Sequence, residues 1–330
     1  MIIYCNKWGT LPDGRSVELY TIQNTAGNSV SISTFGGIIT SIIMPDASGH
    51  LSDIVLGYDT LSEYVLDDAY FGAMIGRYSN RIAHGEYTHN GTTWCLTKNQ
   101  NGNTLHGGSG FNKKLWTASP SNKGLLLEYH SPHGEDGFPG NLDVSILCSL
   151  SEDNCFTMDM TAVSDQDTVC SLTNHSYFNL AGQGTTLNHL FEICAEYYTP
   201  TLPNRIPDGS IQSVTGTEFD FRQKRKLTNP KLDVNYVIPT GQKYSASVTD
   251  PISGRKLTIS SDLPAMQFYT AGGLTARSGK NTNQYGPNSG FCLEPQFFPN
   301  SPNTDTFPSC ILKKGEVYHH TIRYLFSTNN

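Results

Sequence analysis

The sequence predicts an all-β fold, a large antiparallel β-sandwich with few short helices. Several segments alternate apolar and polar residues with a period of two, which is typical of strands that bury one face. Glycine and proline, 31 and 17 residues, punctuate the whole chain, as many turns require. Strands do not alternate with long helices, so an α/β fold is not expected. We find no linker, repeat or low-complexity segment and expect residues 1–330 to form a single domain.

One short helix is expected near residue 60. Thr60 and Glu63 have the spacing of a capping box, in which each side chain satisfies a backbone N–H group of the first turn. Leu61, Tyr64 and Val65 follow at positions that fall on one helical face. The pattern therefore predicts a short helix of one or two turns with one apolar face.

Three later segments carry the clearest strand pattern. Residues 142–150 place Leu, Val, Ile and Cys at every second position, with mostly Asp and Ser between them. Residues 156–162 and 318–326 repeat the alternation. Because side chains of a strand point alternately to its two faces, each segment is expected to bury one face in the core.

The composition excludes several classes of partner. The net charge is -7 and only 15% of residues are charged, against about 25% in typical proteins. Nucleic-acid binding needs concentrated Lys and Arg, and the one basic cluster, residues 222–226, is interpreted as a solvated loop. No stretch approaches 18 uninterrupted apolar residues, so no membrane span is expected.

The cysteines favour a cytoplasmic location. None of the eight lies in a CxxC pair, and in a chain of this length they are interpreted as reduced thiols, several of them in core strands. The amino terminus lacks a basic segment followed by a long apolar one, so no signal peptide is expected. A glycosylation sequon at Asn174 would obstruct the neighbouring His175. An even number of cysteines is also compatible with secretion.

His175 and Glu294 are the strongest candidates for chemistry. His175 lies in NHSYFNLAG (174–182), whose mixture of hydrogen-bonding and aromatic side chains suits a carbohydrate, although a buried structural histidine explains the pattern equally well. Glu294 lies in LEPQFFPNSPN (293–303), where an apolar strand end makes an unpaired carboxylate costly to bury; the alternative is a carboxylate facing water. Together they could supply a general acid and a general base near neutral pH.

Two further residues are candidates for ligand binding. His106 is followed by two glycines, which allow a sharp turn or close approach of the backbone to a ligand; a plain turn histidine is the alternative. Arg81 could hold sugar hydroxyls or a carboxylate with its planar guanidinium group, or form an internal salt bridge.

We expect no cofactor and no metal. The phosphate-loop-like run 273–280 has the wrong spacing, and His319 and His320 would point to opposite faces of a strand.

Seven motifs, in order, resemble those of the aldose 1-epimerase (galactose mutarotase) family, and they span nearly the whole chain. They are FGGIITSIIMPD (35–46), GRYSNRI (76–82), NTLHGG (103–108), NHSYFNLAG (174–182), FDFR (219–222), MQFYT (266–270) and LEPQFFPNSPN (293–303). The resemblance implies a galactose mutarotase-like supersandwich fold. It also implies interconversion of the α and β anomers of free hexoses such as galactose and glucose.

The resemblance also implies roles for individual residues. His175 matches the general acid and Glu294 the general base. The sugar-binding positions match Asn80, Arg81, His106, Gln267 and Asp233. Asp233 lies in LDVNYVI (232–238), where the family usually has an Asp-His pair before the asparagine and this chain has Val234. The expected partner is a small-molecule monosaccharide, bound by a monomer or a homodimer.

Three other functions remain as alternatives. A non-catalytic carbohydrate-binding protein could keep the fold, since fold does not fix function. A hexose-6-phosphate 1-epimerase would need an arginine cluster, and only Arg77 and Arg81 lie near the motif. A glycoside hydrolase usually needs two catalytic carboxylates, which a His/Glu pair fits poorly.

Overall fold

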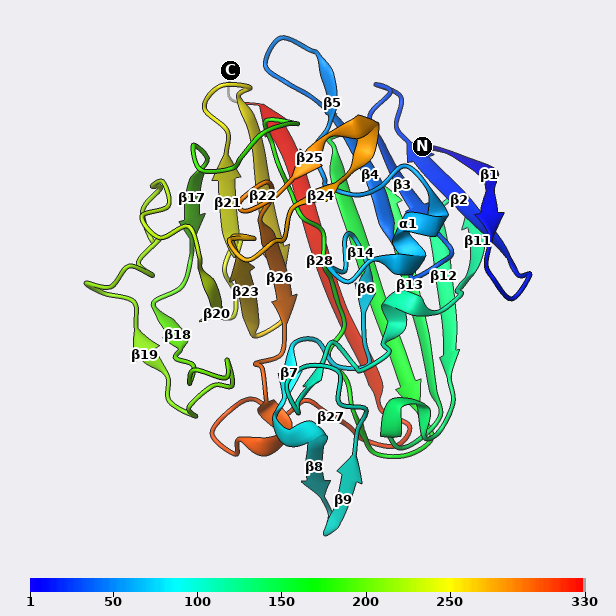
Figure 1. Cartoon of the computed structure of the whole chain (residues 1–330), viewed down its shortest axis with the longest axis vertical. Coiled ribbons are helices and arrows are strands. Elements are labelled where there is room, and N and C mark those ends of the chain that lie inside the picture. The colour runs from blue at the N-terminus through cyan, green and yellow to red at the C-terminus, as the bar shows by residue number, and fades with distance from the viewer. Residues whose placement is uncertain (329–330) are drawn as a thin grey trace.

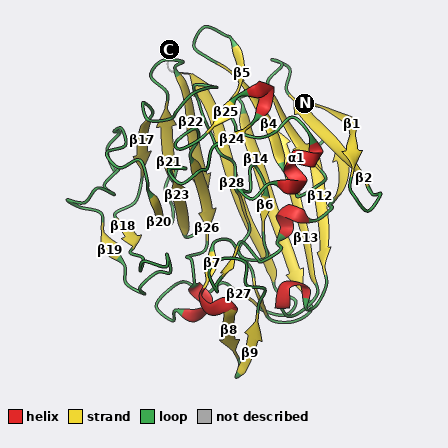
Figure 2. Cartoon of the chain, viewed as in Figure 1, coloured by secondary structure: helices red, strands yellow, loops and turns green. Residues whose placement is uncertain are grey.

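The computed structural model describes residues 1–328, and strands dominate it (Figure 1, Figure 2). The predicted all-β class is confirmed, and every pairing between the strands of its sheets is antiparallel. In Figure 1 the blue N-terminal sheet lies at the right, and the yellow-green strands β18 (Tyr197–Thr199) and β19 (Gln212–Ser213) lie at the left. The long red strand β28 (Val317–Thr328) runs behind and between them.

Three sheets contain most of the strand residues. The first has the order β1 (Ile2–Thr10), β2 (Ser16–Gln23), β3 (Ser29–Ser33), β4 (Ile39–Pro45) and β5 (Leu51–Asp53). The second has the order β11 (Thr117–Ser121), β12 (Gly124–Ser131), β13 (Leu142–Leu150), β14 (Cys155–Ser164), β28 (Val317–Thr328), β22 (Arg255–Ser261), β21 (Ala246–Thr249) and β17 (Leu190–Ile193). The third has the order β19 (Gln212–Ser213), β18 (Tyr197–Thr199), β20 (Asp233–Val237), β23 (Ala265–Tyr269) and β26 (Cys292–Gln296).

Short strand pairs and single helical turns complete the fold. The pairs are β6 (Met74–Ile75) with β16 (Thr173–Asn174), β7 (Arg81–Ile82) with β10 (Thr104–Leu105), β8 (Glu86–His89) with β9 (Thr92–Cys95), β15 (Thr168–Val169) with β27 (Ile311–Leu312), and β24 (Arg277–Ser278) with β25 (Gln284–Tyr285). The helical segments are α1 (Leu61–Leu66) and the 3₁₀ turns η1 (Ala83–Gly85), η2 (Phe111–Lys113), η3 (Glu135–Gly137), η4 (Lys280–Thr282) and η5 (Ser301–Asn303).

The three segments predicted as strands are confirmed as β13, β14 and β28. In β13 the apolar positions of the alternation are buried, and the residues between them are half-buried or exposed. In β14 the same alternation buries every second residue from Phe156 to Ser164. Because β13, β14 and β28 are neighbours in the eight-stranded sheet, their buried faces form one continuous surface of the main core.

The predicted helix near residue 60 is confirmed as α1. The Glu63 carboxylate accepts a hydrogen bond from the Thr60 backbone N–H at 3.0 Å, which is one half of a capping box. Leu61 and Tyr64 are buried and Val65 is half-buried, so the predicted face packs inward. No helix in residues 1–328 is long and apolar enough to cross a membrane.

The basic cluster at residues 222–226 lies on the surface, as predicted. Arg222, Lys224 and Lys226 are exposed. Arg225 is half-buried, with its guanidinium carbon 4.4 Å from the centre of the Phe221 ring. A solvated loop with one cation stacked on an aromatic ring explains these charges without a nucleic-acid partner.

Buried arginines connect segments that lie far apart in the chain. Arg255 donates hydrogen bonds to the carbonyl oxygens of Met44, Leu180 and His50 at 2.9–3.2 Å. Arg77, only 2% exposed, donates in the same way to the carbonyl oxygens of Ser131, Pro132 and Pro139. Because each guanidinium has several donors in a fixed plane, one side chain can satisfy several otherwise unpaired backbone groups.

Candidate active site

A cavity of about 290 Å³ contains all seven residues that the sequence singled out as site candidates. Loops and strand ends from the third sheet and from the short strand pairs form its walls. The candidates on its lining are Asn80, Arg81, His106, His175, Asp233, Gln267 and Glu294. Candidates up to 214 positions apart in the sequence, Asn80 and Glu294, therefore meet in one place.

His175 is held rigidly at the cavity wall. It directly follows β16, its backbone N–H donates to the Ala73 carbonyl at 2.9 Å, and its own carbonyl accepts from the Gly72 N–H at 3.0 Å. Its ring stacks between those of Tyr70 and Tyr177, with centroids 5.8 and 5.0 Å away and planes inclined by 18° in both cases. Backbone pairing and ring stacking together leave the imidazole little freedom to turn.

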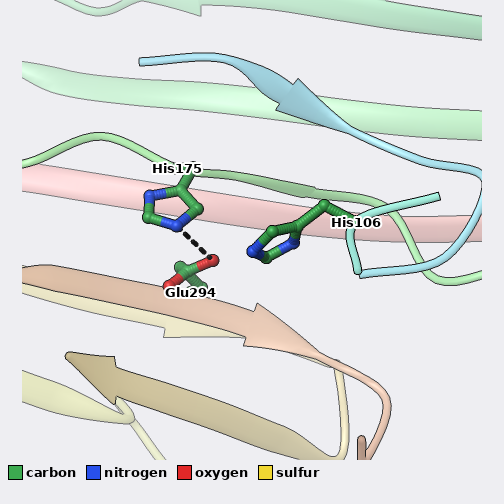
Figure 3. A group of neighbouring side chains, drawn as sticks. All are labelled: His106, His175 and Glu294. Atoms are coloured by element: carbon green, nitrogen blue, oxygen red, sulfur yellow. Dashed lines mark ion pairs between the residues drawn. The ribbon is translucent and has the colours of Figure 1, made fainter. Parts of the chain in front are cut away.

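Glu294 projects into the cavity from β26, a strand at the edge of the third sheet. The neighbouring Pro295 has no N–H group, and an edge position tolerates it because no ladder bond is lost on the open side. Glu294 is 2% exposed, and its Oε2 atom has no hydrogen-bond partner among residues 1–328. The same atom lies 3.7 Å from Nε2 of His175 (Figure 3). A buried carboxylate oxygen without a donor is costly, so this atom is free to meet a hydroxyl group of a ligand.

Burial dominates the protonation of this pair. Desolvation lowers the pKa of His175 to about 4 and raises the pKa of Glu294 well above its usual value. The negative charge of Asp233 adds to the rise in the pKa of Glu294, and Arg81 opposes it. Burial therefore favours neutral His175 with protonated Glu294 over the charged pair. The charged pair has the same total number of protons and differs only in that one proton has moved from Glu294 to His175.

A short strand pair positions three of the expected sugar-binding residues. In the β7/β10 pair, Leu105 is opposite Arg81, which places Asn80 beside His106. The His106 N–H donates to the Asn80 carbonyl at 3.0 Å, and the Asn80 N–H donates to His106 Nδ1 at 3.2 Å. Arg81 donates from Nε to Gln100 at 2.7 Å and forms no ion pair within the described chain, so an internal salt bridge is wrong for this residue.

The ligand atoms of His106, His175 and Glu294 lie within 4.8 Å of one another, which is close enough to hold a metal ion (Figure 3). The hydrogen bond from Asn80 nevertheless fixes the tautomer of His106. Burial lowers the pKa of His106 well below its usual value, so its ring is neutral, and an occupied Nδ1 acceptor leaves the proton on Nε2. His106 therefore presents an N–H donor to the cavity, which suits a sugar oxygen better than a metal ion.

Asp233 is bound through both of its oxygen atoms. Gln267 donates from Nε2 to Oδ1 at 2.6 Å, and Arg205 approaches Oδ2 with Nη1 at 3.0 Å. Gln267 itself lies directly opposite Glu294 in the β23/β26 pair. Asp233 thus lies in the cavity although Val234 follows it, and its charge is partly balanced by a residue from another loop.

Sequence reasoning missed several residues of the lining. Arg205 and Arg277 both reach the cavity, and neither lies near a recognised motif. Arg277 pairs with Asp68 at 2.8 Å and with Asp67 at 3.4 Å. Arg77, which the motif suggested as a neighbour of the site, does not line the cavity and serves the core instead. The further unpredicted residues on the lining include Tyr70, Gln100, Tyr177, Tyr269 and Asp68.

Comparison with protein families gives a match over most of the chain. The family described as aldose 1-epimerase matches residues 18–325. The chain is 38% identical to galactose mutarotase of Rattus norvegicus over 334 residues, which covers 97% of both chains. It is 34% identical to aldose 1-epimerase of Escherichia coli strain K12, with 96% of both chains covered.

Solved structures give the same result at the level of the fold. An aldose epimerase homologue from C. elegans superposes with a TM-score of 0.90 at 29% identity, over 94% of this chain and 98% of that one. Galactose 1-epimerase from Lactobacillus acidophilus superposes with a TM-score of 0.88 at 24% identity, over 100% and 99% of the two chains. The predicted mutarotase-like sandwich is therefore confirmed.

Proposed function

The chain belongs to the aldose 1-epimerase family and is a mutarotase, an enzyme that interconverts sugar anomers, and from this premise we propose that His175 and Glu294 are its catalytic acid and base. The observation that carries the proposal is the buried Oε2 atom of Glu294, which has no donor in the described chain and faces Nε2 of His175 at 3.7 Å. A sugar whose O1 and O5 atoms meet these two groups would be correctly placed for ring opening.

The reaction requires only two proton transfers. The Glu294 carboxylate removes the proton of the C1 hydroxyl, and the O1 electrons form the carbonyl double bond. The C1–O5 bond breaks, and O5 takes a proton from the His175 imidazolium. Rotation about C1–C2 presents the other face of the aldehyde, and the reverse transfers close the ring. Each positioned transfer contributes roughly 10²–10⁴-fold to the rate.

The burial of the pair assists the opening step. The closed ring needs charged His175 and charged Glu294, and opening leaves both groups neutral. Neutral His175 and protonated Glu294 form the state that burial favours, as the directions of their pKa shifts indicate. Since buried charges are costly, forming the charged pair requires free energy, and this free energy is recovered when the ring opens and both groups become neutral.

The remaining candidates would bind the sugar and orient it. His106 offers its Nε2–H group, and Arg81 offers guanidinium N–H groups that its bonds to Gln100 and Asn80 leave available. Asp233 and Gln267, which are hydrogen-bonded to each other, would accept from and donate to hydroxyl groups next to Glu294. Asn80 holds both Arg81 and His106 in place and contributes its own amide.

The charges on the cavity wall favour a neutral sugar over a sugar phosphate. Three arginines and three carboxylates line the cavity, and both Arg205 and Arg277 already pair with aspartates. A phosphate group would have to displace those partners. A protein that only binds sugars would not need a buried, unpartnered carboxylate next to a histidine. A glycosidase would need a second free carboxylate, and Asp233 is bound through both oxygens.

We extend the proposal to the substrate and setting. Relatives named galactose mutarotase support D-galactose as a substrate, with D-glucose as the second candidate. The continuous family match supports one domain over residues 1–330. Eight unpaired cysteines support a cytoplasmic location, and the donor tautomer of His106 supports catalysis without a metal. We propose further that the protein acts as a monomer or a homodimer and uses no cofactor.

Polarimetry on freshly dissolved α-D-galactose and α-D-glucose tests the proposal. The wild-type enzyme should speed the approach to anomeric equilibrium beyond the buffer rate. His175→Asn and Glu294→Gln should each lower kcat by roughly 10²–10⁴-fold, because each removes one proton transfer. Wild-type protein that binds either sugar but leaves the buffer rate unchanged would overturn the assignment.

Two surface variants provide matched controls. His84 is exposed and has a φ of 56°, a conformation that asparagine tolerates, so His84→Asn removes an imidazole at little structural cost. Glu86→Gln removes an exposed carboxylate in the neighbouring strand. Both should retain full activity, and equal losses in control and site variants would show that the assay reports general damage.

A further inference from the structure

Both ring nitrogens of His175 lie close to side chains of one strand, β26. Nε2 faces the Oε2 atom of Glu294 at 3.7 Å, and Nδ1 lies 3.5 Å from the Sγ atom of Cys292. Cys292 and Glu294 are two positions apart in β26, so their side chains leave the same face of the strand. The strand that supplies the proposed base therefore also contacts the nitrogen of His175 that takes no part in the proton transfers.

Cys292 meets His175 as a neutral thiol. Its side chain is fully buried in an apolar cluster and does not line the cavity. Burial raises the pKa of Cys292 well above its usual value, and the negative charges of Glu294 and Asp233 raise it further. The sulfur therefore keeps its proton at neutral pH. A thiol can still accept a hydrogen bond through its sulfur, although it is a weak acceptor.

The chemistry of the cycle decides which partner donates in this hydrogen bond. When His175 is an imidazolium, both of its nitrogens carry protons, so the Sγ atom of Cys292 can only accept. Opening of the sugar ring removes the proton from Nε2 and leaves the proton on Nδ1 in place. In the neutral pair, protonated Glu294 can donate to His175 only if Nε2 is bare, which again places the ring proton on Nδ1. The Nδ1–H group can therefore donate to Cys292 at every stage.

We propose that Cys292 is a positioning residue that keeps one ring proton of His175 on Nδ1, so that Nε2 alone exchanges protons with the sugar. Stacking on Tyr70 and Tyr177 fixes the plane of the ring. Stacking is nearly the same for either edge of an imidazole, however, so it does not select the nitrogen that faces the cavity. The inference rests on the proposed catalytic role of His175 and adds the residue that sets its tautomer.

A thiol suits this role better than a charged group would. A carboxylate next to Nδ1 would favour the imidazolium form and raise the pKa of His175. The sulfur of Cys292 has no charge, so it can orient the ring without stabilising the charged form. Burial therefore keeps the pKa of His175 low, which assists release of the Nε2 proton to the sugar.

Nitrogen NMR of the histidine rings in isotope-labelled protein tests the inference directly. The signals of His175 are identified by their loss in His175→Asn. In the wild type at neutral pH, Nδ1 should give the signal of a protonated nitrogen and Nε2 that of a bare one. In Cys292→Ala the two tautomers should mix, because the acceptor for Nδ1–H is removed. Cys292→Ser should keep the wild-type tautomer, because a hydroxyl oxygen also accepts.

Polarimetry on α-D-galactose adds a kinetic test. Cys292→Ala should lower kcat roughly three- to tenfold, the effect of one lost hydrogen bond. KM should change little, because Cys292 does not line the cavity. Cys292→Ser should recover most of the lost kcat. A residue that only supports the fold would change neither the tautomer nor the balance between kcat and KM.

Cys148→Ala is the matched control. Cys148 is equally buried, lies on β13 in the second sheet and does not line the cavity, so its loss should change neither the tautomer of His175 nor kcat. A wild-type ring protonated on Nε2, an unchanged tautomer in Cys292→Ala, or equal losses of kcat in Cys148→Ala and Cys292→Ala would overturn the role of Cys292 and leave the proposed function intact. Full activity of His175→Asn would overturn both.

Discussion

At the scale of single residues, the site shows what a local motif can and cannot reveal. The seven candidates were recognisable because each lies in a short run of distinctive composition, and all seven line one cavity. Arg205 carries no such signal, because it reaches Asp233 from a loop 28 positions earlier, and only the folded chain brings them together. For His175 and Glu294, the sequence alone does not show whether burial or ion pairing has the larger effect on their pKa values.

The pH dependence of kcat/KM tests whether burial controls the pKa values of His175 and Glu294. The active pair has one proton, so activity should fall when the pair gains a second proton or loses the first. Burial lowers the pKa of His175 to about 4, so the acid limb should lie near that value. Burial raises the pKa of Glu294, so the alkaline limb should lie well above the usual carboxyl range.

Polarimetry with the buffer rate subtracted at each pH gives this profile. Between the two limbs kcat/KM should be level, since one proton can move between the two groups without exchange with solvent. A fall in activity as the pH is lowered through the ordinary histidine pKa of about 6.5 would show that burial does not control the pKa of His175. A flat profile would remove both groups from the chemical step.

At the scale of elements, prediction succeeded where the alternation was long. The strands β13, β14 and β28 each contain nine or more residues, so the period of two is unmistakable. The pairs β6/β16 and β7/β10 consist of two-residue strands, which are too short to show any period. These short pairs position His175, Arg81 and His106, so the elements closest to the chemistry were the hardest to predict.

Substitution in β13 measures the contribution of the alternation to stability. Ile146 is 2% exposed and pairs with Met160 on β14 and Leu127 on β12. Ile146→Ala should lower the free energy of unfolding by about 2–5 kcal/mol, because it removes buried methyl groups and leaves a cavity. Ser145→Ala, next to it on the other face, should change it by less than about 0.5 kcal/mol. Urea unfolding of both variants gives the comparison, and equal effects would contradict the one-sided burial of β13.

At the scale of the whole molecule, the eight cysteines are distributed as reduced thiols. Cys5 and Cys95 are exposed, Cys155 and Cys194 are half-buried, and Cys148, Cys170, Cys292 and Cys310 are buried. The sequence predicted reduced thiols from their spacing. It could not assign their burial, because burial depends on how the three sheets pack.

Titration with a chromogenic thiol reagent checks this distribution. Without reductant, the two exposed thiols should react first and the two half-buried thiols more slowly. The four buried thiols should react only when the chain is unfolded in denaturant. A total of fewer than eight thiols in denaturant would reveal a disulfide bond and would contradict the cytoplasmic assignment.

The place of β28 in the largest sheet bears on the order in which the protein can assemble during synthesis. β28 lies between β14 and β22, pairing with Cys155–Val163 on one side and Arg255–Ser261 on the other (Figure 1). A ribosome makes β28 after both neighbours, so until then two long strand edges remain unpaired in the nascent chain. Unpaired edges invite association between chains. Insertion of β28 therefore covers both exposed edges in a single step.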